Sequence, residues 1–397
     1  MTPRLTIVST WYGPDTAGGA EVAARRLAQA IHALGYPIDV WTTTARDAFA
    51  PRAPYYPSGP GTDEGITVRR FIVSPELEES TIPAAAAQHP LVQRTLKQLN
   101  PPRRELRVLS TLVHSDALLQ ALVAEAEQRQ YIFVPYPLPI SVWGGMMVPE
   151  QSYLLPCMHD EPYAYHHLSR WQIQHAQKLM ANSAQERDFL ITTFALPAER
   201  VVLSRLGIDL TVIGNGAAFR DTYGITTPML FFAGRRDVTK NVPLLILYVQ
   251  EYILRRGRLV TLVLSGRDSI ELTSYQRVYV RDVGFLSEQD KADAFAAADV
   301  FIHAGTQESF AFVLMESWLQ GRPALVNRDC AVTAGAVAEA RGGLDFNDFA
   351  SFAAALDILL EHPDVASSFG EAGRDYVQHH CRWPDVAARV VSAVQGE

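Results

Sequence analysis

The sequence predicts an α/β protein made of two doubly wound domains. Short apolar runs, typical of buried parallel strands, alternate along the chain with segments of helical periodicity. The length of 397 residues exceeds that of one domain of ordinary size. The alternation is interrupted over residues 204–224 and then resumes. We therefore expect one Rossmann-like domain over residues 1–210 and a second over residues 211–380.

In the first half, strands are expected at residues 5–10 and 38–42, with a helix between them that ends at Gly35. Residues 45–65 are rich in Pro, Gly and Tyr and are expected to form a long loop. The later elements expected in this half are helices over residues 91–130 interrupted at Pro101–Pro102, strands at 131–135 and 152–157, and a helix over 164–180.

Residues 131–149 carry no charge, and their length would suffice to cross a bilayer. Pro135, Pro137 and Pro139 would break the hydrogen bonds of a helix, so we interpret the segment as a buried strand followed by a turn. The N-terminus lacks the basic, apolar and small-residue segments of a signal peptide. We therefore expect a cytoplasmic protein.

The second half repeats the alternation of strands and helices, which predicts a second parallel sheet covered by helices. Its expected strands lie at residues 229–233, 260–265, 278–280, 300–304 and 324–327. Its expected helices lie at residues 243–255, 288–298 and 311–320, and two further helices complete the chain.

The charge and the cysteines exclude several classes of protein. The net charge is −8, from 35 Lys and Arg against 43 Asp and Glu, and neither half is strongly basic, which argues against nucleic acid as a main partner. Cys157, Cys330 and Cys381 have no paired spacing. We interpret them as buried thiols rather than as a disulfide or a zinc site.

Four loops that follow expected strands are the candidate sites, because ligands of open parallel sheets bind beyond the carboxyl ends of the strands. The first loop runs from Trp11 and Tyr12 to Gly18 and Gly19, which precede a helix. Paired glycines there let backbone N–H groups approach a phosphate. The alternative is a flexible turn, and the spacing does not fit the dinucleotide-binding fingerprint.

The second loop follows the expected strand at residues 152–157 and contains His159, Asp160 and Glu161. These side chains are suited to contact a sugar hydroxyl or to transfer a proton. One alternative is a metal site that includes the neighbouring histidines, although the spacing fits no usual ligand pattern. The other is an aspartate that only caps a helix.

The third loop begins at Gly234 and carries Arg235 and Lys240 at the end of the first strand of the second half. Arg holds a diphosphate with a planar fork, and Lys holds it with a point charge. The alternative is a solvated basic loop, but the half of the chain around this loop is acidic.

The fourth loop follows residues 300–304 and leads into an apolar helix. Ser309 is expected to cap this helix, which would leave the backbone N–H groups of Phe310–Phe312 available to an anion. Glu308 precedes the cap, and Glu316 interrupts the helix two turns later. A carboxylate in apolar surroundings needs a partner, and a ribose with two adjacent hydroxyls is one. The alternative is a glutamate that reaches solvent.

Together these features resemble those of the retaining glycosyltransferases of family four. The resemblance rests, in reverse chain order, on Glu308-x7-Glu316, on Gly234-Arg235 with Lys240, on His159-Asp160 and on the loop Gly18–Glu21. It extends over essentially the whole chain. It implies the GT-B fold, in which two Rossmann-like domains face each other across a cleft and the last helix, here residues 381–397, returns to the N-terminal domain.

The resemblance also implies roles in donor binding for residues of the second half. Glu308 would hold hydroxyls of the donor sugar, and Glu316 would hold the ribose. Arg235 and Lys240 would bind the diphosphate and stabilise it as it leaves, with help from the backbone at Ser309–Phe312. The base would pack near Val283.

In the first half, Gly18 and Gly19 would close on the phosphates, and His159 would lie near the sugar. His159 is thus grouped with Glu308, Arg235 and Lys240 as catalytic. The remaining candidates on the acceptor side are Asp160, Glu161, Trp11 and Tyr12.

The implied reaction transfers a sugar from a nucleoside-diphosphate sugar to an acceptor hydroxyl with retention of configuration, in bacterial glycan, glycolipid or natural-product glycoside synthesis. No carboxylate is an obvious nucleophile beneath the sugar, so we expect front-face attack. The sequence contains no Asp-x-Asp, so we expect neither a metal nor another cofactor. Ala311 and Asn241 depart from the family pattern, because Gly is frequent at both positions, and the methyl group of Ala311 would narrow the approach of a phosphate.

Two other functions fit the same fold, a nucleotide-sugar epimerase and a non-catalytic partner subunit. A non-catalytic subunit would be expected to lose the charged site residues, which this chain keeps. The acceptor is expected to be a carbohydrate, a lipid-linked molecule or a small molecule, and the protein a monomer or a homodimer. Basic residues between Arg69 and Arg107 would contact an anionic lipid surface at the inner face of the membrane, or would form a solvated helical face.

Overall fold

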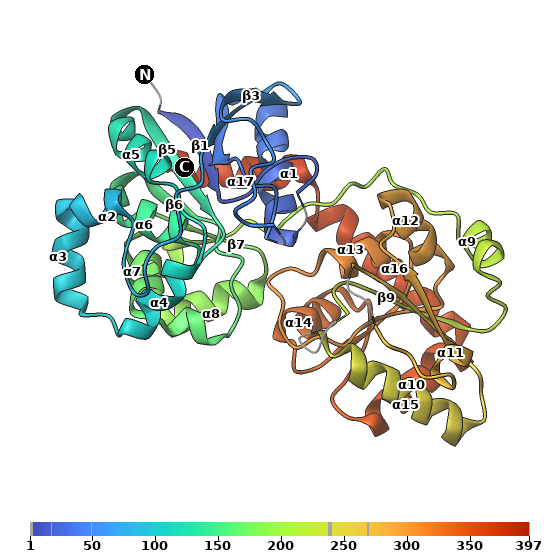
Figure 1. Ribbon diagram of the computed structural model, residues 1–397. Coiled ribbons are helices and arrows are strands. Elements are labelled where there is room, and N and C mark those ends of the chain that lie inside the picture. The colour runs from blue at the N-terminus through green and yellow to red at the C-terminus, as the bar shows by residue number, and fades with distance from the viewer. Residues whose placement is uncertain (1–2, 17, 49, 237–239, 268–269, 397) are drawn as a thin grey trace. The chain divides into compact units, whose positions relative to one another are not determined.

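The computed structural model describes residues 3–16, 18–48, 50–236, 240–267 and 270–396, and it divides into two compact units (Figure 1). Unit 1 contains Met1–Leu206 and Trp383–Glu397, and unit 2 contains Gly207–Arg382. Each unit has its own sheet and its own hydrophobic core. The predicted α/β class with two doubly wound domains is confirmed.

The sheet of unit 1 has the strand order β3-β4-β2-β1-β5-β6-β7-β8, and all neighbours are parallel except β3 and β4. Its strands are β1 (Arg4–Ser9), β2 (Ile38–Thr43), β3 (Gly59–Asp63), β4 (Ile66–Phe71), β5 (Arg129–Val134), β6 (Ser152–Leu154), β7 (Leu179–Ala181) and β8 (Val201–Leu203). The six strands from β4 to β7 follow the order of a Rossmann sheet, in which the direction of winding reverses between the two central strands, here β1 and β5.

The helices of unit 1 connect these strands, and the last helix of the chain joins them by packing against α1. They are α1 (Gly19–Ala33), α2 (Ala84–Gln88), α3 (Pro90–Leu99), α4 (Arg103–Thr111), α5 (Asp116–Ala124), α6 (Pro139–Met147), α7 (His167–His175), α8 (Ala184–Phe194) and α17 (Trp383–Gln395). Short 3-10 turns occur at Ala126–Gln128, Pro149–Gln151, Pro162–Tyr165 and Ala198–Arg200.

The sheet of unit 2 is parallel throughout and has the order β11-β10-β9-β12-β13-β14, again that of a Rossmann sheet. Its strands are β9 (Met229–Ala233), β10 (Thr261–Ser265), β11 (Val280–Gly284), β12 (Val300–His303), β13 (Ala324–Asn327) and β14 (Gly343–Phe346). Its helices are α9 (Gly216–Tyr223), α10 (Val242–Arg256), α11 (Gln276–Tyr279), α12 (Glu288–Ala297), α13 (Phe312–Leu319), α14 (Ala331–Ala340), α15 (Phe349–Glu361) and α16 (Pro363–His380).

The turn predicted after the strand at residues 131–135 is wrong, because α6 forms there and is buried along its whole length. Pro139 occupies the first turn of α6, where its missing N–H group costs nothing and its fixed φ suits the helix. The prolines therefore lead into the helix instead of preventing it. In the described part of the chain, no single helix has the length and apolar composition to cross a membrane, and one pair of helices, α4 with α5, meets that test only jointly and is bent by 101°.

Several predicted boundaries are also corrected. The expected loop at 45–65 contains β3, which pairs with β4 despite a glycine-rich sequence of low strand propensity. The helix expected at 164–180 ends at His175, and the apolar residues that follow form β7 between β6 and β8. The short strand expected at 278–280 is the end of α11 and the start of β11.

The end of the chain is more elaborate than the two helices predicted. After β13 come α14, the strand β14, and the helices α15, α16 and α17. The sequence does not predict the strand β14, because its four residues include a glycine and an aspartate, which rarely favour strands. The interval around residues 204–224, which showed no clear period, contains α9.

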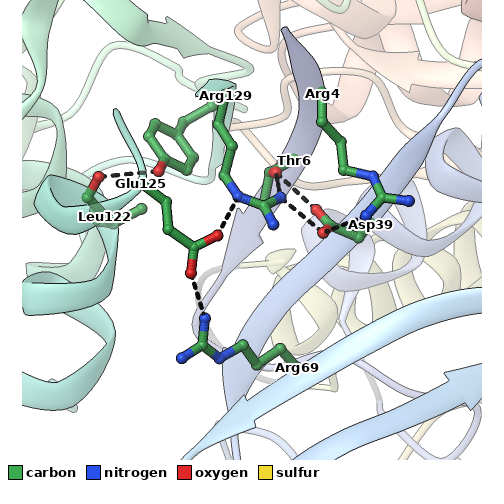
Figure 2. A network of polar contacts seen from close by, with 8 residues as sticks. Arg4, Thr6, Asp39, Arg69, Leu122, Glu125 and Arg129 are labelled. Carbon is green, nitrogen blue, oxygen red and sulfur yellow. Dashed lines mark hydrogen bonds and ion pairs between the residues drawn. The ribbon is translucent and has the colours of Figure 1, made fainter. Parts of the chain in front are cut away.

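A network of charged side chains ties four strands of unit 1 together (Figure 2). The buried carboxylate of Asp39 on β2 accepts hydrogen bonds from Thr6 Oγ1 on β1 at 2.6 Å and from Arg129 Nη1 on β5 at 2.7 Å. Glu125 accepts from Arg129 Nε and from Arg69 Nη1 of β4, both at 2.7 Å. The network fixes the strands relative to each other, and it engages Arg69, one of the basic residues considered for a lipid surface.

Candidate active site

The candidate site of unit 2 lies where the winding of its sheet reverses, between the adjacent strands β9 and β12. The loop after β9 leads to Lys240, and the loop after β12 carries Gly305 and Glu308. Both loops leave the carboxyl ends of parallel strands, so they meet at one edge of the sheet. This edge is the usual ligand position in such sheets.

Lys240 and Glu308 are in direct contact at this edge. Lys240 Nζ donates a hydrogen bond to Glu308 Oε1, and His303 Nε2, from the end of β12, lies 2.9 Å from the same oxygen. A Cβ atom on Gly305 would lie 3.2 Å from both Lys240 and His303, so the glycine leaves room for the cluster. Burial alone would raise the pKa of Glu308, but the hydrogen bond from His303 and the charge of Lys240 lower it to about 2. Glu308 is therefore ionised at neutral pH.

The backbone beneath this cluster is held by two asparagines. Asn241 Nδ2 and Asn327 Nδ2 each donate to the carbonyl oxygen of Ala304 at 3.0 Å. Asn241 has a φ of 54°, a left-handed conformation that Asn tolerates better than most residues. This conformation explains why glycine suits the position in the family pattern. Neither contact was predicted from the sequence.

The two neighbouring arginines after β9 have different environments. Arg235 is exposed at the end of the strand. Arg236 is buried, forms an ion pair with Asp282 of β11 and donates to the carbonyl oxygen of Gly266 at 2.6 Å. Arg236 therefore serves the packing of the sheet edge, whereas the neighbouring Arg235 lies on the surface. Residues 237–239 of the same predicted loop lie outside the described residues.

The start of α13 differs from the prediction. Ser309 does not cap the helix, because Ala311 takes the capping position with φ 65° and ψ 71°, and the helix begins at Phe312. A residue in the left-handed region cannot continue a helix, so the first turn starts after it. In the described part of the chain no side chain caps this helix, so its first N–H groups are uncapped. Phe310 is buried and packs edge-on against Phe312 at 5.2 Å between ring centroids.

Glu316 of α13 has a protein partner that the sequence did not indicate. Lys291 Nζ of α12 donates to Glu316 Oε1 at 3.0 Å. Glu316 Oε2 is buried and accepts no hydrogen bond from the described residues. Burial raises the pKa of Glu316, and the charge of Lys291 opposes the rise. The need of this carboxylate for a partner is thus met at one oxygen and unmet at the other.

Val283, the residue predicted near a base, lies half-buried on β11. Phe285, just beyond the end of β11, is 65% exposed, and the Arg267 guanidinium lies 4.7 Å from the centre of its ring. An exposed aromatic ring of this kind offers a flat face to a ligand.

In unit 1, the glycine loop ends at α1. Gly18 has a φ of 137°, a backbone conformation that residues with a side chain rarely adopt, so glycine is favoured there. Gly19 is exposed and begins α1, which no described side chain caps. Burial raises the pKa of Glu21 to about 7. The side chains of Trp11 and Tyr12 are buried, so the structure places neither on the surface as an acceptor contact.

The loop after β6 carries His159, Asp160 and Glu161. Glu161 lies near His159, whereas Asp160 has a different partner. Glu161 accepts a hydrogen bond from the Tyr136 hydroxyl and lies 3.6 Å from His159 Nδ1. Asp160 accepts from the Tyr165 hydroxyl at 2.7 Å and caps no helix. Tyr136 was not predicted, because only the fold brings the end of β5 to this loop.

A buried glutamate supports the same loop from behind. The carboxylate of Glu186, in the first turn of α8, accepts hydrogen bonds from the backbone N–H groups of Met158 and, at 2.6 Å, Asn182. Burial raises the pKa of Glu186 to about 8, and these two hydrogen bonds oppose the rise. Among the described residues, no three His, Cys, Asp or Glu side chains are grouped as a metal site would require.

Two Rossmann units in one chain, the second with cationic and acidic side chains at its switch point, are the architecture expected of a GT-B protein. Residues 18–207 match the sequence profile described as "Glycosyl transferase 4-like domain", and residues 227–362 match the profile described as "Glycosyl transferases group 1". Both profiles describe glycosyl transferases, and together they cover most of the chain, with the group 1 profile lying within unit 2.

Curated relatives with known names are similar over nearly the whole chain. The chain is 26% identical to "D-inositol 3-phosphate glycosyltransferase 2" of Catenulispora acidiphila, over 95% of this chain and 89% of the relative. It is 25% identical to "D-inositol 3-phosphate glycosyltransferase" of Kribbella flavida, over 92% and 88%. These similarities agree with a glycosyltransferase.

Solved structures share the fold at lower identity. Sucrose-phosphate synthase from Thermosynechococcus elongatus has a TM-score of 0.71 at 18% identity, with 99% of this chain and 98% of that chain covered. Anabaena HepE in complex with UDP has a TM-score of 0.66 at 15% identity, with 99% and 100% covered. WaaG, a glycosyltransferase involved in lipopolysaccharide biosynthesis, has a TM-score of 0.67 at 15% identity, again with 99% and 100% covered. The GT-B fold is therefore confirmed.

Proposed function

We propose that the protein transfers a sugar, with retention and without a metal, from a nucleoside-diphosphate sugar to an acceptor hydroxyl. The observation that carries this proposal is the cluster of Lys240 and Glu308 at the switch point of unit 2. A cation beside an ionised carboxylate is suited to bind the diphosphate and the sugar of such a donor. The cation attracts the diphosphate, and the carboxylate accepts hydrogen bonds from sugar hydroxyls.

In this proposal the leaving diphosphate is stabilised by charges that are already in place. Lys240 is held by Glu308, Arg235 is exposed at the same edge, and the uncapped start of α13 presents backbone N–H groups at its positive end. Preorganised positive charge of this kind lowers the energy of a transition state in which negative charge develops on the leaving group. The released phosphate oxygen then takes the proton of the attacking hydroxyl.

The ribose of the donor is assigned to Glu316. Its Oε1 atom is held by Lys291, and its Oε2 atom is buried without a hydrogen-bond donor among the described residues. A buried acceptor without a donor is costly, and a ribose hydroxyl would satisfy it. The base is assigned to the neighbourhood of Val283 and the exposed ring of Phe285.

A uridine nucleotide is the first donor to test, because structural relatives are described in complex with UDP and UDP-glucose. For the acceptor we propose a phosphate-bearing molecule, because the curated relatives are named for D-inositol 3-phosphate. Unit 1 offers a basic hollow for such a group. A cavity of about 610 Å³ is lined by Glu79, Ser80, Arg103, Arg104, Leu106 and Arg107.

The three arginines of this hollow are exposed and lie in the first turns of α4, whose N-terminus no described side chain caps. Cations near a helix N-terminus repel its dipole, and Arg103 and Arg107 repel each other one turn apart, although Arg107 also pairs with Glu79 at 3.4 Å. A bound phosphate relieves both repulsions. Arg69 and Arg70 do not join this surface, because they are engaged with Glu125 and with the carbonyl oxygen of Tyr12.

Donor binding is tested by thermal shift with UDP, GDP, ADP, dTDP and their glucose and mannose conjugates. A ligand at 100 times its Kd adds about 2.7 kcal/mol to the free energy of unfolding. With the donor that binds, incubation with inositol phosphates should give a glycoside whose anomeric configuration, read by NMR, matches that of the donor. Epimerised nucleotide sugar in the absence of acceptor would contradict transfer, and loss of activity in EDTA that Mg²⁺ restores would contradict the metal-free reaction.

A second experiment tests the basic hollow and distinguishes a soluble phosphorylated acceptor from a lipid headgroup. We expect the triple variant Arg103→Gln, Arg104→Gln, Arg107→Gln to raise the KM for a soluble phosphorylated acceptor and to keep the donor affinity. Co-sedimentation with phosphatidylglycerol vesicles, reduced by the same variant, would instead assign the hollow to a lipid headgroup. Unchanged acceptor KM and unchanged vesicle binding would contradict an anion site at this place.

A further inference from the structure

We infer that His303 is a positioning residue, which acts with Lys240 to hold the Glu308 carboxylate so that its second oxygen is presented to the donor sugar. The inference rests on the proposed function of Glu308 as the ligand of sugar hydroxyls. It concerns a side chain that the sequence did not single out, at the end of β12.

The two donors of this cluster converge on one atom. Lys240 Nζ and His303 Nε2 both contact Glu308 Oε1. An ionised carboxylate only accepts hydrogen bonds, so His303 carries a proton on Nε2 and donates it. The hydrogen bonds that Glu308 accepts from described side chains both go to Oε1. One oxygen is therefore occupied by the protein, and the other is left for a ligand.

The placement of His303 is difficult to explain by packing alone. It is 2% exposed and follows the apolar residues Val300–Ile302 on the same strand. Its Nδ1 atom is buried without a hydrogen-bond partner among the described residues, so the contact with Glu308 is its one polar interaction there. Burying an imidazole with one polar contact costs free energy. The contact with Glu308 is the interaction that this burial preserves.

The two donors hold Glu308 in different ways. The Lys240 ammonium sits on a flexible stem with rotatable donors, so by itself it allows the carboxylate to turn. The His303 ring is fixed by the rigid strand and donates along one direction. Together they set the rotation of the carboxylate about its own axis, which a single contact does not. A hydrogen bond to a sugar hydroxyl depends on that rotation.

The experiment compares affinities for UDP and UDP-glucose by calorimetry, with GDP and GDP-mannose as a second pair. His303→Leu removes the donor and keeps an apolar side chain of similar size. We expect it to weaken binding of the nucleotide sugar about 10- to 100-fold, the usual effect of losing a hydrogen bond to a charged group, and to leave affinity for the free diphosphate within twofold. His303→Gln, whose amide donates from a similar distance, should recover most of the loss.

The control is Ile302→Val on the same strand, which loosens the packing and touches no site residue. A merely structural role for His303 would weaken both ligands in His303→Leu, as a packing defect does, and would overturn the inference. Equal nucleotide-sugar affinity in wild type and His303→Leu would overturn it as well. A wild-type protein that binds neither pair contradicts the proposed function itself, and the inference that rests on it.

Discussion

Lys291 Nζ lies 3.0 Å from Glu316 Oε1, so an ion pair joins α12 to α13 within unit 2. Both side chains are more than three-quarters covered. Burial by itself would lower the pKa of Lys291, yet the charges of Glu316 and Glu288 raise it. Each charge therefore depends on the other to tolerate its covered position.

Replacing Lys291 by Met should destabilise the protein, because it leaves the Glu316 carboxylate covered and unpaired. We expect a loss of about 2–3 kcal/mol in the free energy of unfolding, somewhat below the cost of breaking a fully buried pair. The double variant Lys291→Met, Glu316→Leu should recover most of this loss. Urea unfolding of the three variants measures it, and a double variant as unstable as the single one would refute the pairing.

Glu316→Gln should weaken nucleotide binding, because the amide cannot supply a second acceptor at the position of Oε2 while keeping Lys291 in place. We expect a loss of about tenfold or more in affinity for UDP, measured by calorimetry. His159→Ala, in unit 1, should leave affinity for UDP nearly unchanged and lower kcat. If His159→Ala weakened UDP binding more than Glu316→Gln, the roles assigned to these residues would be overturned.

Ala311→Gly should stabilise the protein, because Ala311 has a φ of 65° and an L-residue with a side chain is strained there. The relief is about 1 kcal/mol. Arg341→Gly is the matched control, since Arg341 has a φ of 52° at the end of α14, away from the site, and should give a similar gain. If the methyl group of Ala311 also narrows the phosphate site, only Ala311→Gly should tighten UDP binding. Thermal unfolding with and without UDP separates the two effects.

The carboxyl group of Glu21 should make the stability pH-dependent. Its pKa is raised from 4.5 to about 7 by burial, so the folded state binds this proton more tightly than the unfolded state. The stabilisation is complete below pH 4.5 and is lost as the pH rises through 7. Relative to Glu21→Gln, the wild type should therefore be less stable at pH 8 than at pH 5, by on the order of 3 kcal/mol. Urea unfolding of the wild type and of Glu21→Gln at the two pH values measures this, and an equal pH dependence of the two proteins would contradict it.

Much of the fold could be predicted from the sequence, because parallel strands in the core have recognisable apolar runs. The expected strand at 324–327 matches β13, and the expected helix at 288–298 differs from α12 by one residue. The secondary structure was predicted wrongly where one residue type can either end or begin an element. A proline within a segment predicts the end of a helix, but Pro139 lies in a first helical turn, where proline favours the start of one.

The residues of the candidate site could be predicted only in part, for a different reason. Lys240 and Glu308 were visible because each follows an expected strand, and strand order alone brings such residues together. His303 and Lys291 could not be found in this way. The first continues an apolar run and the second lies on a polar helix, so neither has a local signal. Their roles depend on which side chains they meet, and that is a property of the packed structure.

Unit 1 is assembled from both sides of unit 2 in the sequence. The helix α17 packs against α1, Tyr153 donates to the carbonyl oxygen of Val394, and Arg389 donates to that of Ser204. During translation, unit 2 is therefore complete before unit 1 receives its final helix. The face of α1 that α17 covers therefore has no partner until residues 383–395 have been synthesised. Unit 1 therefore cannot complete its fold before all of unit 2 has been synthesised, which differs from the usual N-terminal-first order of domain folding.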